Sequence, residues 1–214
     1  MQVRSVERIS KCFDSKACRF CKDYEESGIS KSSKILLDQL SDYGFEGKNL
    51  LDLGCGIGSF SVRALQRGVV SSVGFDLSTE MISMACRLSD KSGLNDRVSF
   101  NRGDASKVNL PPSEIVVLDK VMCCYPDIKE LLCNSSGAAI EYYAFIIPRS
   151  DNLGSRILAT TIITIGNLIS RITGKNQIYI HNFMEINKRL SEGGFFRIFR
   201  KPSGIWLIFI YQRN

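Results

Sequence analysis

Residues 50–60 read LLDLGCGIGSF: an apolar run that contains Asp52 is followed by Gly54, Gly56 and Gly58. The apolar part has the length of a buried strand, and the residues after the glycines have the pattern of a helix. A glycine-rich turn between the first strand and helix of an α/β sheet lets a ligand approach backbone N–H groups. This stretch therefore predicts both a fold class and a binding site.

Strands and helices alternate around this unit. We expect helices over 31–45, 59–68, 78–93, 127–132 and 180–194, strands over 49–53, 70–76, 97–104, 113–120 and 138–147, and a terminal hairpin that turns around Pro202, Ser203 and Gly204. Such alternation predicts a parallel sheet covered on both faces. No repeat or domain boundary is visible, so we expect a single domain over 1–214. Its special parts are an N-terminal arm and helix (1–45) and a helical insertion (148–180).

Composition limits the class of protein. With 214 residues and 44% hydrophobic content, the chain can bury one core. The formal charge of +6 is scattered along the chain, so nucleic acid is not an indicated partner. The N-terminus lacks the apolar core of a signal peptide, so we expect a cytoplasmic protein. The apolar stretch 157–169 is too short to span a bilayer, although the region 155–175 leaves peripheral membrane contact open. The sequence leaves the oligomeric state open.

The glycine turn fits neither of two common phosphate-binding motifs. A dinucleotide fingerprint that starts at Gly54 needs glycine where Ser59 stands, and the G-K-[ST] of a phosphate loop is absent. Instead, acids stand at the ends of successive strands, at Asp52, Asp76 and Asp104. The first suits the amino group of an amino-acid-like ligand, the second a pair of ribose hydroxyls, and the third an adenine edge. A ligand with these three parts is S-adenosylmethionine.

With these residues, the chain resembles the class I S-adenosylmethionine-dependent methyltransferases. The resemblance covers residues 30–147 and rests on LDLGCGIG, VGFDLS, GDAS and IVVLDKVMCCYP, which follow one another in the family's order. It implies a Rossmann-like α/β fold with a seven-stranded, mostly parallel sheet, an antiparallel terminal hairpin and helices on both faces. It also implies a methyltransferase that uses S-adenosylmethionine as cofactor. The cofactor-binding residues that it implies are Asp52, Gly54, Cys55, Gly56, Asp76, Leu77, Asp104, Ala105 and Asp119.

Within that family, the chain looks most like a branch that includes the magnesium-protoporphyrin methyltransferases. The segments VLDKVMCCYPD and IYIHNFMEINKRLSEGGF carry this likeness. The chain departs from the branch at Cys124, where those enzymes have a histidine before Tyr-Pro, and at Cys12, where they have a tyrosine. These departures argue against a porphyrin acceptor.

The methyl acceptor is expected to be a small, apolar molecule that is methylated on a carboxylate or hydroxyl oxygen. A carboxylate needs no base, whereas a neutral hydroxyl can need one. The candidate catalytic residues are His181, Tyr125 and Cys124, near Asp119 and Lys120 at the end of the fourth strand. His181 can equally be a helix-start residue that bonds to local backbone.

Alternative functions stay open. The chain can be a cofactor-binding sensor or partner subunit without turnover. Cys12, Cys18 and Cys21 could approach Cys123 or Cys124 and hold a metal or a metalloid acceptor, although zinc needs four ligands and a second CxxC is absent, so no metal site is assigned. A nucleic-acid or protein methyltransferase is disfavoured because LDKVMCCYP lacks the [DN]-P-P-[YF] pattern of amino-group methylation.

Overall fold

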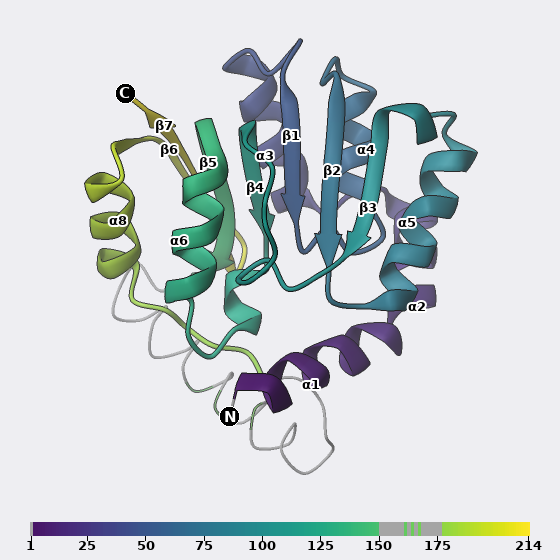
Figure 1. The fold of residues 1–214 in the computed structure, drawn as a ribbon, viewed down its shortest axis with the longest axis horizontal. Helices are drawn as coiled ribbons and strands as arrows, with labels where there is room; N and C mark the ends of the chain where they lie inside the picture. The colour runs from purple at the N-terminus through teal and green to yellow at the C-terminus, as the bar shows by residue number, and fades with distance from the viewer. Residues whose placement is uncertain (1, 150–160, 162–163, 165–166, 168–176) are drawn as a thin grey trace.

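A seven-stranded sheet forms the centre of the molecule, in the order β3-β2-β1-β4-β5-β7-β6 (Figure 1). The computed structural model describes residues 2–149, 161, 164, 167 and 177–214. The strands are β1 (Asn49–Leu53), β2 (Ser71–Asp76), β3 (Val98–Arg102), β4 (Ser113–Asp119), β5 (Ala139–Pro148), β6 (Phe195–Ser203) and β7 (Trp206–Arg213). Strands β1 to β5 pair in parallel, and β7 runs antiparallel between β5 and β6. The predicted mostly parallel sheet with an antiparallel terminal hairpin is confirmed.

Helices cover both faces of this sheet. Helices α3 (Lys31–Asp42), α4 (Ser59–Leu65) and α5 (Thr79–Lys91) pack on one face, and α6 (Lys129–Ala138) and α8 (Phe183–Glu192) on the other. Successive strand residues point to opposite faces, so Leu50 packs in the layer with Leu36 of α3 while Leu51 packs in the layer with Leu131 of α6. Short 3₁₀ turns are η1 (Asn95–Arg97) and η2 (Met122–Cys124).

All five predicted helices are present, with ends that differ from the prediction by up to six residues, and α4 and α6 show the physical reasons. Helix α4 ends at Leu65 rather than at residue 68, because the chain turns through Gly68, which has a left-handed φ of 106°. Helix α6 continues to Ala138, through the polar residues Ser135 and Ser136, rather than ending at residue 132. Ser135 is buried, and its hydroxyl bonds the Leu131 carbonyl (2.6 Å) and the Tyr143 hydroxyl (2.7 Å), so tertiary contacts extend the helix.

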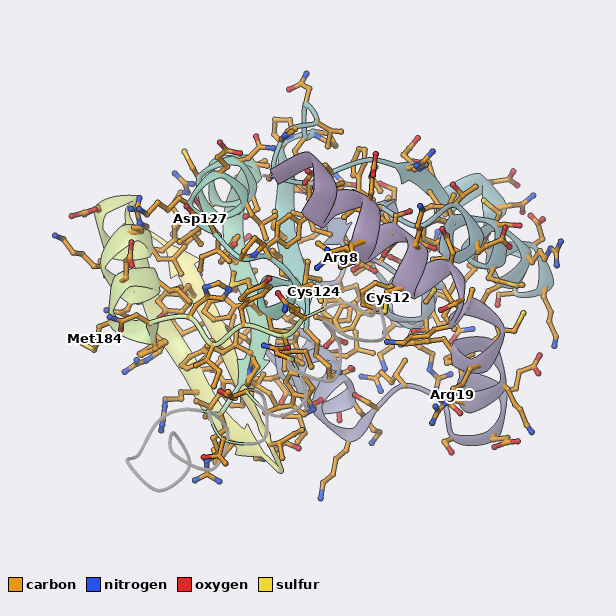
Figure 2. The ribbon with its side chains drawn as sticks, turned by 90° about the horizontal axis from the view of Figure 1, so that it is seen from below. Arg8, Cys12, Arg19, Cys124, Asp127 and Met184 are labelled. Carbon is orange, nitrogen blue, oxygen red and sulfur yellow. The ribbon has the colours of Figure 1, made fainter. Side chains whose placement is uncertain are left out.

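The N-terminal arm consists of two helices that the sequence analysis did not predict, α1 (Gln2–Asp14) and α2 (Ala17–Ser27). Val6, Ile9 and Phe13 have the three- and four-residue spacing of one helix face, a signal that was available in the sequence. Helix α1 crosses below the carboxyl ends of the parallel strands (Figure 1), and Figure 2 views the molecule from that side. The arm thus lies at the end of the sheet where ligands bind in such folds.

Helix α1 is fastened to the chain that follows β2 by three hydrogen bonds. The Asp14 carboxylate accepts from the Ser78 hydroxyl (2.6 Å) and from the backbone N–H of Glu80 (3.2 Å). The Ser10 hydroxyl donates to the Leu77 carbonyl (3.0 Å). We call these three hydrogen bonds the α1 latch. It ties α1 to the N-terminus of α5.

The predicted helical insertion at 148–180 lies for the most part outside the described residues. Three residues within it, Thr161, Thr164 and Asn167, are helical. The Asn167 side chain bonds both backbone groups of Ile178, at 2.7 and 2.8 Å. Among the helices of the described residues, none is both long and apolar enough to cross a membrane.

Candidate functional site

The strand order reverses between β1 and β4, and the loops that follow these two strands touch. A Cβ atom added to Gly54, just after β1, would lie 2.4 Å from Cγ2 of Val121, just after β4. Gly54 also has φ of 68°, a conformation that residues with a side chain rarely adopt. Glycine is therefore required at this position twice over, by space and by backbone conformation.

A cavity of about 740 Å³ opens beside this contact. Its volume falls within the range of small-molecule sites. The sequence-predicted residues that line it are Asp52, Gly54, Cys55, Gly56, Asp76, Leu77, Ala105, Asp119, Cys124 and Tyr125. No atom lies within 4 Å of a Cβ placed on Gly56, so the turn presents bare backbone to the open space. Residues from distant parts of the sequence thus meet at one site.

Three backbone donors of the glycine turn are already engaged within the protein. The N–H groups of Gly54 and Cys55 donate to the Phe75 carbonyl (2.7 and 3.1 Å), and that of Gly56 donates to the Asp76 carboxylate (2.9 Å). The sequence analysis expected such donors to bind a ligand carboxylate. These three N–H groups are therefore not open to a ligand carboxylate in this structure.

Asp76 stands at the end of β2 with its carboxylate on the cavity wall. One oxygen accepts the Gly56 N–H and the other accepts the Ser78 N–H (2.8 Å). Burial raises the pKa of Asp76 above its ordinary value, although these two bonds oppose the shift. Each carboxylate oxygen can accept a second bond, so the group is held in place with capacity left for two hydroxyls.

Asp52 is almost fully buried, with 1% of its surface exposed. The Ser61 hydroxyl, on α4, donates to it (2.7 Å) and is itself bonded to the Ser72 hydroxyl (3.0 Å). Burial raises the pKa of Asp52 to about 7, and the charges of Asp119 and Asp76 act in the same direction. This concentration of carboxyl groups favours a cationic ligand.

Asp104 follows β3, and its carboxylate is engaged by other side chains of the protein. Its Oδ1 accepts hydrogen bonds from the Tyr125 hydroxyl (3.0 Å) and the Ser106 hydroxyl (2.7 Å). The cavity wall next to it is made by Gly103 and Ala105. The role of Asp104 in reading an adenine edge stays a prediction.

Lys120 forms a charged cluster on the wall with Asp119 and with two serines that the sequence analysis missed. Its Nζ lies 2.9 Å from Asp119 Oδ1 and from the hydroxyl oxygens of Ser30 and Ser33. The Ser33 hydroxyl also donates to the other oxygen of Asp119. Ser30 caps α3, and Ser33 lies in the first turn of that helix. Ser33 and Asp119 are 86 residues apart in the sequence. No spacing in the sequence signals this contact.

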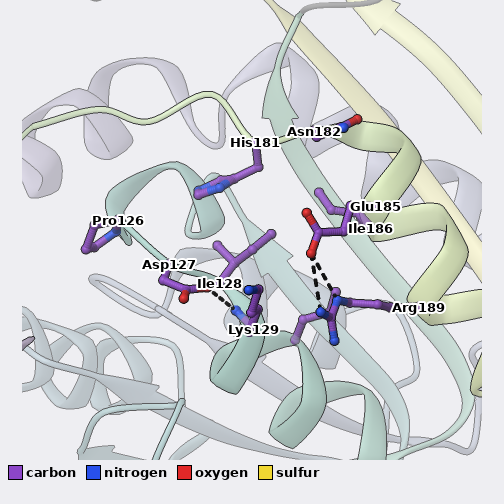
Figure 3. Close-up of a pocket in the computed structure, with 10 residues that line it drawn as sticks. Pro126, Asp127, Ile128, Lys129, His181, Asn182, Glu185, Ile186 and Arg189 are labelled. Atoms are coloured by element: carbon purple, nitrogen blue, oxygen red, sulfur yellow. Dashed lines mark hydrogen bonds and ion pairs between the residues drawn. The ribbon is translucent and has the colours of Figure 1, made fainter.

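The three candidate catalytic residues do not share one place. Tyr125 and Cys124 line the large cavity, whereas His181 lines a separate pocket of about 280 Å³ (Figure 3). There, His181 Nε2 lies 2.9 Å from the Met122 carbonyl oxygen, and Figure 3 shows it between Pro126 and Asn182. Burial lowers the pKa of His181, so the ring is neutral at physiological pH.

The raised pKa values of Tyr125 and Cys124, the two candidate residues in the large cavity, do not suit either side chain to act as a base. Burial and the adjacent Asp104 carboxylate raise the pKa of Tyr125, whose hydroxyl donates to that carboxylate. The pKa of Cys124 is raised well above its ordinary value by its contact with Cys123 and by burial. Both side chains are therefore protonated at neutral pH.

The N-terminal helices close one side of the cavity with apolar side chains, among them Ile9, Phe13, Phe20 and Tyr24. The cysteines of this region are in different environments, since Cys12 is buried, Cys18 exposed and Cys21 in between. Within the part of the chain that the structure describes, no group of three or more His, Cys, Asp or Glu side chains could hold a metal ion. The metal-linked alternative gains no support from this geometry.

The sheet order, the reversal point and the cavity beside the glycine turn define the class I methyltransferase fold. Residues 45–196 match the family model described as a methyltransferase domain, so the chain belongs to that family. The expected family is thereby confirmed.

Solved structures with the same fold support this assignment. Magnesium protoporphyrin IX methyltransferase from Synechocystis PCC 6803, with bound SAH, superimposes with a TM-score of 0.74 at 18% identity, over 96% of this chain and 98% of that one. An O-methyltransferase family protein from Burkholderia thailandensis gives 0.70 at 16% identity, over 90% and 59% of the two chains. The likeness to the magnesium-protoporphyrin branch is confirmed at the level of the fold.

Curated relatives are similar over shorter stretches. Ribosomal protein L11 methyltransferase of Mannheimia succiniciproducens is 26% identical over 110 residues, which are 50% of this chain and 37% of the relative. Norajmaline N-methyltransferase of Rauvolfia serpentina is 39% identical over 64 residues, 30% of this chain and 21% of the relative. The chain thus spans well under half the length of these relatives.

Proposed function

We propose that the chain binds S-adenosylmethionine in the large cavity and transfers its methyl group to a small, apolar acceptor in the same cavity. The observation that carries the proposal is that Asp52, Asp76 and Asp119, from the ends of three strands, line one cavity beside a glycine turn. When bound, the cofactor supplies a methyl group on a positively charged sulfur, and the chain's residues hold and orient it.

The residues fit the parts of this cofactor. Asp76 keeps lone pairs for the two ribose hydroxyls, while Leu77 and Ala105 border the space for the adenine. Asp52 and Asp119 place negative charge near the amino and sulfonium groups. Asp119 is the more accessible of these two, because its side chain is 17% exposed, whereas Asp52 is 1% exposed as a whole residue.

A carboxylate acceptor suits the wall of the cavity best. Tyr125 and Cys124 are protonated at neutral pH, and His181 lies in a different pocket. A carboxylate is already ionised at that pH and needs no proton acceptor, so positioning and exclusion of water suffice. Ile9, Phe13 and Phe20 supply an apolar surface for the rest of such a molecule.

The test is transfer of a radioactive methyl group from S-adenosylmethionine to a panel of aromatic and aliphatic carboxylic acids, with the matching alcohols and amides alongside. We expect methyl esters from acids and no product from the amides. Y125F should keep at least half of the activity if no base is needed. Esterification that depends on the Tyr125 hydroxyl would contradict this mechanism.

The same assay addresses the alternative of a sensor without turnover. Calorimetry on the same sample measures binding of S-adenosylhomocysteine. Tight binding together with no transfer to any acceptor in the panel would favour the sensor, which the protonated state of Tyr125 and Cys124 also allows.

A further inference from the structure

The carboxylate of the proposed cofactor needs hydrogen-bond donors, and three N–H groups of the glycine turn are already bonded within the protein. The N–H groups of Gly54 and Cys55 are bonded to Phe75, and that of Gly56 to Asp76. A carboxylate placed in an otherwise acidic cavity requires a cation or several donors in compensation. The cavity wall offers such a set at Lys120.

We propose that Asp119 and Lys120, with Ser30 and Ser33, bind the amino-acid end of the cofactor. Asp119 receives its ammonium group, and Lys120 with the Ser30 hydroxyl receives its carboxylate. This assignment rests on the proposed function, because it specifies how the same cavity holds S-adenosylmethionine.

The charges of the cluster mirror those of the ligand. Lys120 and Asp119 meet at 2.9 Å with only 24% and 17% of their side chains exposed. An amino-acid end carries one positive and one negative group on the same carbon. Its entry gives each protein charge a new opposite partner and leaves the cluster neutral, so no buried charge is left alone.

The serines hold the pair in a geometry that a ligand can share. The Ser33 hydroxyl donates to Asp119 and accepts from Lys120, and the Ser30 oxygen lies 2.8 Å from the Ser33 oxygen. The ring of Trp206 lies 5.6 Å from Lys120 Nζ and borders the same cavity. The ammonium of Lys120 is thus confined to the cavity wall.

The backbone at Lys120 is unusual. Its φ of 63° is left-handed, and Lys120 is the only non-glycine residue with a positive φ in the part of the chain that the structure describes. Consecutive residues of a strand point to opposite faces, so this turn directly after β4 helps to return the Lys120 side chain to Asp119. Such strained positions persist where surrounding contacts fix them and are concentrated at binding sites.

The test compares two ligands by calorimetry. S-adenosylhomocysteine has the amino-acid end, whereas 5′-methylthioadenosine has the same nucleoside without it. For K120M, we expect at least a tenfold loss of affinity for S-adenosylhomocysteine and less than a twofold change for 5′-methylthioadenosine. K120R, which keeps the charge, should recover most of the loss. K188M, which removes a lysine paired with Glu192 on α8, is the matched control and should leave both affinities unchanged.

The outcomes separate this inference from the proposed function. Lys31, at the start of α3, also lines the cavity. Equal loss for both ligands in K120M, or a selective loss in K31M but not in K120M, would overturn the assignment to Lys120. Failure of the wild-type protein to bind either ligand would overturn the proposed function itself.

Discussion

At Asp76, one carboxylate both holds the glycine turn and faces the ligand space. D76A removes the acceptor of two ribose hydroxyls, and hydrogen bonds to a charged group contribute about 1.5–3 kcal/mol each. For two such bonds we therefore expect roughly a 100- to 10,000-fold weaker affinity for S-adenosylhomocysteine, measured by calorimetry. D96A, at an acid of η1 outside the cavity, is the control. An unchanged affinity in D76A would place the ribose elsewhere.

Asp52 makes a prediction about stability and pH. Its pKa is about 7 in the folded protein against an ordinary 3.8, so the folded state binds a proton more tightly than the unfolded chain. This contribution to stability is fully present below pH 3.8 and is lost as the pH rises through 7. The loss amounts to roughly 1.4 kcal/mol per unit of pKa shift, or a few kcal/mol in total.

D52N removes this titration. Urea unfolding at pH 5 to 8 should show the wild type losing stability relative to D52N, with the difference levelling off above pH 8. Subtraction of the two profiles cancels other titrating groups, such as His181. Parallel profiles would mean that Asp52 titrates near its ordinary pKa.

At the scale of the elements, the loop after β1 is constrained by the loop after β4. G54A forces a Cβ to within 2.4 Å of Val121 and into left-handed backbone, so it should destabilise the protein by about 2–5 kcal/mol. G56A meets open space and should lose only about 1–2 kcal/mol while weakening ligand binding. V121A should recover part of the loss in G54A. Thermal unfolding measures all of these, and equal losses in G54A and G56A would exclude the clash.

The α1 latch makes a second prediction at this scale. D14A removes an acceptor for Ser78 and for the N–H of Glu80, and loss of such a capping group costs about 0.5–2 kcal/mol. We expect faster dissociation of S-adenosylhomocysteine in stopped-flow measurements, because α1 closes the cavity. D14N keeps an acceptor oxygen and should lie between D14A and the wild type. Identical dissociation rates would show that α1 does not gate the site.

The sheet was predictable from the sequence because its central strands β1, β4, β5 and β7 are short apolar runs, and each motif stands at a strand end. Val6, Ile9 and Phe13 also carried a helical signal for α1. The contacts of Ser33 with Asp119 and of Asp14 with Ser78 could not be predicted, since they join segments that only the folded sheet brings together. The position of His181 in a pocket apart from the cavity likewise depends on tertiary packing.

For the whole molecule, ligand binding should raise the unfolding temperature. At a ligand concentration of 100 Kd, binding adds about 2.7 kcal/mol to stability, which corresponds to roughly 5–10 °C for a chain of this length. Differential scanning fluorimetry with S-adenosylhomocysteine measures the shift. The same concentration should shift D76A much less, and an equal shift in both would indicate binding outside the proposed site.

The α1 latch joins two tasks in a single carboxylate. Asp14 accepts hydrogen bonds at the N-terminus of α5 and also fastens α1, the helix that closes the cavity. One of its partners, Ser78, follows Asp76 by two residues in the connection between β2 and α5. Opening α1 to exchange a spent cofactor must therefore leave the start of α5 without one of its acceptors. The residence time of the product, rather than the chemical step, would then set the pace of repeated turnover.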